Sequence, residues 1–489
     1  MRLVVAFALA VTATVALAAE PPANFAAHFV DTTMRVDFTH MGNAAEEVIA
    51  LDRVWAEGIW AGSRSNLVDP FGGGRYRAKV FDPATGALLF SRGFDSYFGE
   101  YRTTPAAAKG ERRCYHESVL VPFPKHKVRF SIEVHSSGRA PVTLASFDID
   151  PGSWEVLRAP LQEGAVVVDA WHSGDPHAKV DVVIVGEGYS RAEEGKFRAD
   201  LERFARIFLA AEPYRTLRDR FNIRGVLSYS QDSGISEPSY GSVKRSAVGA
   251  TFDSLGTERY VLTEDNRALR DVAAHVPYDT ICIMVNSARY GGGGIYNLFS
   301  TFTTDDQWHA YIFLHEFGHS FGGLADEYYT SLVAYNEFYP KGTEPNEANI
   351  TALLDPVALK WRALVTPGTP IPTPWEKAGF DEMDTAYQKV RQELNERIAR
   401  LKREGAPRQE IEKLQGESDR RSREHQDRVD SYFAKSKYVG QVGAFEGAGY
   451  SAQGLYRPML DCLMFSKGAK PLCRVCQAAV TRVIEHFTE

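Results

Sequence analysis

The sequence has no excess of positive charge, only five cysteines in 489 residues, and almost no long apolar run. A formal net charge of -7 gives no electrostatic reason to expect a nucleic-acid partner, because phosphate recognition requires basic patches. Beyond the N-terminus, no stretch approaches the roughly 20 apolar residues that cross a bilayer. We therefore expect no nucleic-acid binding and no stable membrane span after signal cleavage.

The exception is the N-terminus. Arg2 precedes an apolar run from Leu3 to Ala19 that ends in small residues. A basic residue, an apolar stretch and small residues at its end are typical of a signal peptide. A membrane anchor is the alternative, but the run is short and alanine-rich for one. The pattern predicts a cleaved signal peptide over residues 1–19 and a secreted or periplasmic protein.

Three of the five cysteines cluster near the C-terminus. An odd number in an exported protein leaves at least one thiol unpaired. A structural zinc site, a redox pair and a local disulfide all fit the clustered spacing, although no second C-x-x-C completes a four-cysteine zinc site. Export favours a disulfide and leaves its pairing open. The cysteines are Cys114, Cys282, Cys462, Cys473 and Cys476.

Two domains follow the signal segment. Alternating polar and apolar residues between Gly, Pro and Asp turns predict an N-terminal β-sandwich over 22–163. The polar piece 172–177 marks the expected boundary. After it, an apolar strand at 180–185, a helical pattern at 192–211 and a strand at 280–285 predict an α/β domain over 178–489. The fold class is therefore multidomain, with both α and β structure.

Residues 376–437 form a charged insertion in the second domain. Spaced apolar residues on both sides of a break at 405–407 predict a helical hairpin. The hairpin could be a substrate lid or a partner-binding arm. A solvated amphipathic insertion without a binding role is the favoured interpretation.

The segment 315–319 reads His-Glu-Phe-Gly-His and follows an apolar stretch of the same expected helix. Residues four apart on a helix share one face, so His315 and His319 can both reach one Zn²⁺. Glu316 lies beside them and can take a proton from water at the metal. Two packed core histidines would give the same pattern by chance.

A catalytic zinc needs a third protein ligand. Gly322-Gly323 is a natural helix stop, and the turn after it can return Asp326 or Glu327 to the metal. Asp326 is preferred, because it keeps the Gly-to-ligand spacing of H-E-x-x-H-x-x-G-x-x-H sites, although it lies one residue further from His319. The carboxylate that does not bind metal is expected to hydrogen-bond a histidine.

Four further residues are weaker candidates. Met464, preferred over Met459, would form a Met-turn beneath the metal. Tyr456 could polarise the substrate carbonyl, or be a core tyrosine. Gly292 and Gly293 could belong to an edge strand that binds an extended peptide, or to a simple hairpin turn.

A dinucleotide-binding site is not expected. A Gly-x-Gly follows the strand at 180–185, but Arg191 stands where the third glycine of the fingerprint should be.

Taken together, these residues resemble the IgA-peptidase family of zinc metallopeptidases. The similarity includes the signature at 315–328 and spans most of the chain from about residue 24 to 485. The other similar segments are 182–189, 230–236, 117–124 and the block from Cys462-Leu463-Met464 to Cys473-x-x-Cys476. The resemblance implies a metzincin-like zincin behind a β-sandwich, with His315 and His319 as ligands and Glu316 as base. It does not establish IgA as the substrate, and the insertion around 376–431 is not part of the family pattern.

We therefore expect a secreted, Zn²⁺-dependent endopeptidase that acts on a protein or peptide substrate. Two alternatives stay open. One is an exported binding or scaffold protein with a structural or vestigial zinc site, which would not need Glu316. The other is a zinc amidase that acts on non-peptide amides.

Overall fold

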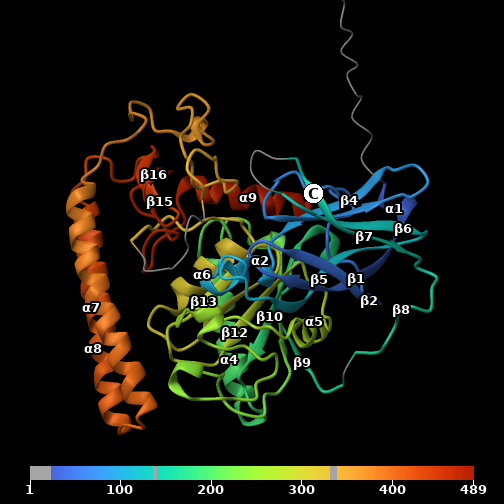
Figure 1. Ribbon diagram of the computed structural model, residues 1–489, viewed down its shortest axis with the longest axis horizontal. Helices are drawn as coiled ribbons and strands as arrows, with labels where there is room; N and C mark the ends of the chain where they lie inside the picture. Colours follow the sequence, from blue (N-terminus) through green and yellow to red (C-terminus); the bar gives the residue numbers. More distant parts are fainter. Residues whose placement is uncertain (1–23, 136–139, 162, 331–338) are drawn as a thin grey trace, which may run out of the picture.

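The computed structural model describes residues 24–135, 140–161, 163–330 and 339–489, so the predicted signal peptide lies outside the described residues. Figure 1 shows the N-terminal strands on one side, a helix-flanked sheet in the centre and a long helical hairpin on the other side.

The N-terminal region contains two four-stranded sheets. All neighbouring strands are antiparallel except the parallel pair β2–β8. The first sheet has the order β5 (Arg113–Pro124), β1 (Phe29–Gly42), β2 (Glu47–Ala56), β8 (Val156–Leu157). The second has the order β4 (Leu88–Phe94), β3 (Tyr76–Phe81), β6 (Val128–Val134), β7 (Val142–Ile149). Short helices accompany them: α1 (Phe25–His28), α2 (Tyr97–Tyr101) and α3 (Pro105–Ala108).

The two N-terminal sheets enclose a common core. Val36 and Phe38 of β1 are buried in the same apolar cluster as Val80 of β3 and Phe130 of β6. Their alternation with polar residues places one face of each sheet inward. The prediction of a sheet-rich N-terminal region is confirmed.

A six-stranded sheet forms the centre of the second domain. Its order is β13 (Gly292–Ile295), β14 (Phe299–Thr303), β12 (Thr280–Val285), β10 (Val180–Glu187), β11 (Phe221–Leu227), β9 (Val166–Trp171). The four central strands are parallel, and the edge strands β13 and β9 are antiparallel to their neighbours.

The expected boundary at 172–177 is wrong in one respect. β9 precedes those residues but pairs with β11, so it belongs to the central sheet. The polar segment 172–177 is therefore a connection within the second domain, and the domain begins before Val166. Polar turn residues mark a reversal of the chain equally well between domains and within one.

Helices cover both faces of the central sheet. Alternate residues of β10 enter two different apolar clusters. Val182 and Ile184 pack with helices α4 (Glu194–Ala210) and α6 (His309–Ser320), whereas Val183 and Val185 share a cluster with α5 (Asn266–Ala273) and the N-terminal sheets. The C-terminal part adds a small sheet of β15 (Phe445–Ala448) and β16 (Ser451–Arg457), and helix α9 (Arg474–Thr488).

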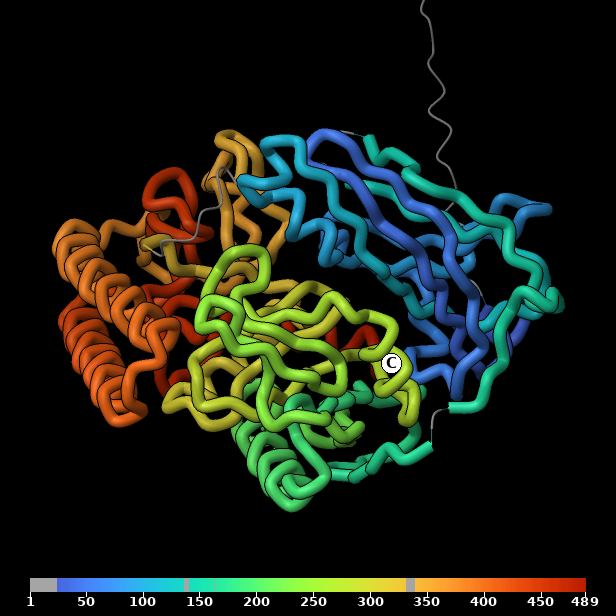
Figure 2. Tube along the Cα trace, turned by 60° about the horizontal axis from the view of Figure 1, so that its bottom comes forward, coloured from blue at the N-terminus to red at the C-terminus, as the bar shows by residue number. Residues whose placement is uncertain are grey.

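The charged insertion is a helical hairpin of α7 (Lys377–Arg403) and α8 (Arg408–Phe433). Figures 1 and 2 place it on the side of the second domain away from the N-terminal sheets. Its base is anchored: Phe380 and Phe433 stack at 5.3 Å and join the apolar cluster that contains helix α6. The hairpin is therefore a fixed part of the domain. Over the described residues, no helix combines the length and apolar character needed to cross a membrane.

The anchoring of the hairpin predicts a large effect of Phe380→Ala. Phe380 is 3% exposed, and loss of a buried phenyl ring costs about 3–5 kcal/mol of stability. We expect a clearly lowered melting temperature of the second domain in calorimetry. Val390→Ala, at a position of α7 that is 40% exposed, is the control and should melt like the parent. Equal melting of both variants would contradict an anchored hairpin.

Candidate functional site

Helix α6 carries the His-Glu-x-x-His segment and ends where the sequence predicts. Gly323 has a φ of +59°, a conformation that glycine adopts without strain. Its amide donates to the carbonyl of His319 at 3.1 Å, and the amide of Leu324 donates to that of Gly318 at 3.1 Å. The first of these bonds, from the left-handed glycine to the carbonyl four residues before it, is that of an αL C-cap, which ends the helix and turns the chain back.

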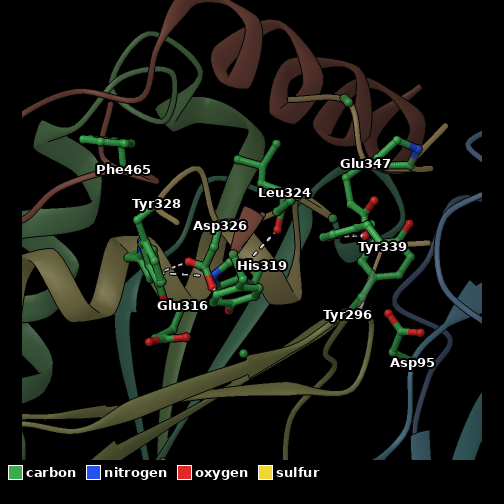
Figure 3. A pocket seen from close by; sticks show the side chains of 18 of the residues that line it. Asp95, Tyr296, Glu316, His319, Leu324, Asp326, Tyr328, Tyr339, Glu347 and Phe465 are labelled. Carbon is green, nitrogen blue, oxygen red and sulfur yellow. Dashed lines mark hydrogen bonds and ion pairs between the residues drawn. The ribbon is translucent and has the colours of Figure 1, made fainter. Parts of the chain in front are cut away.

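The chain after this turn brings Asp326 to both histidines (Figure 3). Oδ1 of Asp326 lies 3.1 Å from Nε2 of His315 and 3.2 Å from Nε2 of His319. The two Nε2 atoms are 3.1 Å apart. Three tetrahedral ligands about 2.05 Å from a zinc ion would be separated by about 3.3 Å. The three atoms therefore form a triangle of the size that one divalent cation requires.

Backbone carbonyls orient both imidazoles. Nδ1 of His315 lies 3.1 Å from the carbonyl oxygen of Leu463, and Nδ1 of His319 lies 2.6 Å from that of Leu324. Since a carbonyl can only accept, each Nδ1 is the protonated nitrogen and donates. Each Nε2 then keeps its lone pair, as a metal-binding imidazole needs.

Electrostatics at the site also favour a cation. Burial alone would raise the pKa of Asp326, but the neighbouring imidazoles hold it well below its usual range. Burial would lower the pKa of His319, yet the Asp326 carboxylate outweighs it and raises that pKa to about 9. Oδ1 of Asp326 is buried and has no hydrogen-bond partner among the described residues; the polar atoms beside it are the two Nε2 atoms. A carboxylate oxygen and two imidazole nitrogens suit zinc.

Glu316 also lies at this site, with a carboxylate oxygen within 4.8 Å of the histidine nitrogens. It could be read as the third ligand instead of Asp326. We favour Asp326, because its oxygen is at 3.1–3.2 Å from both Nε2 atoms and faces only them. Burial raises the pKa of Glu316, so it is a stronger proton acceptor than an exposed carboxylate. That property suits a general base.

The two acidic residues after the helix point in different directions. The carboxylate that does not bind the metal was expected to hydrogen-bond a histidine, but Glu327 does not do so. Its Oε1 accepts from Asn349 at 3.1 Å and lies 3.2 Å from Sγ of Cys476. Asp326 and Glu327 are consecutive residues outside any helix or strand, yet Asp326 faces the two imidazoles and Glu327 faces Asn349 and Cys476.

The expected disulfide is absent, since all five cysteines are free thiols. Sγ of Cys462 and Sγ of Cys476 are 3.9 Å apart, far beyond the roughly 2.05 Å of a disulfide bond.

Met464 lies beneath the two histidines. Gly318, between them on α6, has no side chain, and a Cβ there would be 3.0 Å from Sδ of Met464. Met464 is completely buried. Of the two methionines considered from the sequence, Met464 is the one packed against the helix of the histidines, whereas Met459 is only partly buried.

The glycines of β13 allow the edge strand to approach the helix closely. A Cβ on Gly292 would be 2.6 Å from Ile312, and one on Gly294 would be 2.5 Å from the carbonyl of Glu316. Gly293 faces the opposite side, toward Tyr260, and does not line the cavity at the histidines. The outward backbone groups of Gly292 already bond to residues 259 and 261.

Tyr456 is not at the site. It lies on β16, exchanges backbone bonds with Thr351 and does not line the cavity. Two other tyrosines are there instead. The hydroxyl of Tyr450 donates to Oδ2 of Asp326, and Tyr328 stacks at 6.3 Å on the ring of His315. Their positions depend on chain turns that sequence spacing does not reveal.

A cavity of about 1540 Å³ opens over the three metal-facing groups. Its walls include the N-terminal region, which the sequence had not indicated, and the hairpin, for which a lid was one of the alternatives. The N-terminal region contributes Arg75, Asp95, Glu100 and Arg102, and the hairpin contributes Tyr387, Gln388, Arg391 and His425. Figure 3 shows Asp95, Tyr339 and Glu347 gathered at one end of this cavity, beyond His319.

A helix with His-Glu-x-x-His, a third side chain that closes on both rings and an overlying cavity define a site of the metal-dependent hydrolase class. The comparison with protein families agrees. The model of the IgA peptidase M64 family matches residues 168–484, and that of the M64 peptidase N-terminus matches residues 24–143. The chain belongs to the IgA peptidase M64 family and is accordingly a peptidase. A search of curated proteins found no match.

The geometry predicts that Asp326→Asn weakens metal binding at the histidines. An amide oxygen has no formal charge to offer the cation, so we expect the affinity to fall by at least about 10–100-fold, as changes around metal ligands do. A competition titration of the purified protein with a zinc chelator measures this. Asp219→Asn, at a residue that is 84% exposed, should leave the affinity unchanged. An unaltered affinity of Asp326→Asn would show that another group is the third ligand.

Proposed function

We propose that the protein is an exported, zinc-dependent endopeptidase of metzincin-like type. The observation that carries the proposal is the convergence of His315, His319 and Asp326 on one point at the floor of a large cavity. Three protein ligands leave a coordination position open on the cavity side, as catalytic zinc sites do. The cavity exceeds the 300–1,000 Å³ common for small-molecule sites and suits an extended chain.

A zinc ion held by these residues would polarise the scissile carbonyl and acidify a water molecule. Glu316 accepts the proton of the attacking water, for which its buried carboxylate is well placed. It then returns the proton to the leaving amine. The backbone carbonyls of Leu463 and Leu324 fix the orientation of the two imidazoles. The Nε2 atoms that would bind the zinc ion are therefore positioned in advance.

Other residues of the cavity support substrate binding. Arg259 donates to the Tyr328 hydroxyl at 3.4 Å, and both side chains line the cavity beside His315. They are candidates for donors to the carbonyl oxygen of the substrate, the role first considered for Tyr456. Gly294 also lines the cavity on edge strand β13, where an extended peptide could add by backbone pairing.

Glu316→Ala should abolish hydrolysis while zinc stays bound. Removal of a general base costs about 10²–10⁴-fold in rate. A library of internally quenched peptides measures cleavage, and metal analysis of the same samples measures zinc. Glu202→Ala, at a residue of α4 that is 72% exposed, is the control and should cleave like the parent.

Each rival function has its own outcome in this assay. Cleavage by Glu316→Ala at the parental rate would refute the mechanism. No cleavage by the parent on any peptide, with zinc bound, would favour a binding or scaffold protein. Hydrolysis confined to non-peptide amides would favour the amidase.

Export is proposed from the sequence of residues 1–19. We expect the protein recovered from the medium or periplasm of an expressing bacterium to begin at about residue 20. N-terminal sequencing of that fraction measures this. A protein that retains Met1 and stays in the cytoplasm would contradict export.

A further inference from the structure

A second group of side chains of the types that bind metals includes one residue of the Met-turn, the segment that we define as residues 462–464. It contains Glu327, Cys462, Cys473 and Cys476. All four side chains are buried, and none is more than 4% exposed. Their sulfur and oxygen atoms lie within 4.8 Å of one another.

The separations in this group fit a tetrahedral cation site. Sγ of Cys476 lies 3.2 Å from Oε1 of Glu327 and 3.9 Å from Sγ of Cys462, and Sγ of Cys473 lies 4.0 Å from Oε1 of Glu327. Zinc–sulfur bonds of about 2.3 Å at tetrahedral angles place two sulfurs about 3.8 Å apart. The group thus has the dimensions of a four-ligand zinc site with one carboxylate.

The sulfur atoms of Cys462 and Cys473 also accept hydrogen bonds from backbone amides, which stabilise thiolates. Sγ of Cys462 accepts from the amides of Cys473 at 3.1 Å and Met464 at 3.4 Å. Sγ of Cys473 accepts from the amide of Cys476 at 3.4 Å, which is in the first turn of α9. The positive end of the helix dipole stabilises negative charge at that point.

The carboxylate of Glu327 is otherwise difficult to explain. Its Oε2 is buried without a hydrogen-bond partner among the described residues. Arg457 is the nearby cation, but its guanidinium donates to the carbonyls of Gly447 and Leu460. A buried acid with no ion partner carries a large desolvation cost.

We propose that Glu327, Cys462, Cys473 and Cys476 bind a second, structural zinc ion. With four protein ligands the site has no open position, so it would not take part in hydrolysis. Four anionic ligands around Zn²⁺ leave a net charge of -2, as in the Cys₄ sites of structural zinc proteins. The amide donors, the start of α9 and Arg457 offset that charge.

Such an ion would also stabilise the arrangement of the histidine site. Glu327 follows Asp326 directly, and its amide donates to the carbonyl of Met464 at 2.8 Å. The neighbouring carbonyl of Leu463 orients His315. A metal that joins Glu327 to Cys462 therefore clamps the Asp326 segment and the Met-turn together, and both to α9.

The experiment is metal analysis and zinc X-ray absorption of the full-length protein, purified with a phosphine reductant and supplied with zinc alone. We expect two zinc ions per chain. In the double variant His315→Ala/His319→Ala we expect one, with sulfur neighbours at about 2.3 Å. This readout needs no enzymatic activity, and the cysteines are untouched, so it stands whether or not cysteine variants fold.

Two substitutions separate the cluster from the other thiols. Cys476→Ser should lose one zinc and lower the melting temperature. Cys282→Ser, at a buried cysteine outside the cluster, should keep both ions. A double histidine variant without zinc, zinc without sulfur neighbours, or a disulfide between any two cluster cysteines in peptide mass mapping would overturn the proposal. None of these outcomes bears on the test with Glu316→Ala, so the two proposals fail independently.

Discussion

The approach of one carboxylate to two imidazoles is the constraint on which the rest of the catalytic domain depends. Asp326 can reach His315 and His319 only because the helix stops at a left-handed glycine and the chain reverses within a few residues. The buried carboxylate and rings would be costly to desolvate if they were left apart. Their mutual attraction stabilises the arrangement, and a bound cation would stabilise it further.

Close packing around the helix keeps this geometry in place. Because Gly318 has no side chain, Met464 packs closely against α6. The glycines of β13 likewise allow the edge strand to pack closely against α6. A side chain at these positions would force strand, helix and Met-turn apart by the width of a methyl group. Protein interiors accommodate such changes poorly, because they are packed as densely as organic crystals.

The parts of the chain outside the central sheet shape access to the site. The N-terminal sheets and the base of the hairpin both line the cavity over the histidines. The hairpin was expected to be mainly a solvated insertion, yet Tyr387, Arg391 and His425 lie in the cavity wall. The walls of the cavity thus come in part from segments that lie outside the central sheet and the α6 helix.

The sequence by itself determined the helix with its two histidines and Glu316, two strands of the central sheet at 180–185 and 280–285, the hairpin and the family. Those features follow from local periodicity and from residue types at short spacing. Only the tertiary structure decided that Asp326 faces the rings while Glu327 turns to the cysteines, that Tyr450 and Tyr328 rather than Tyr456 are at the site, and that β9 belongs to the central sheet. The physical reason is that turns and long-range packing, which spacing does not encode, set where a side chain points.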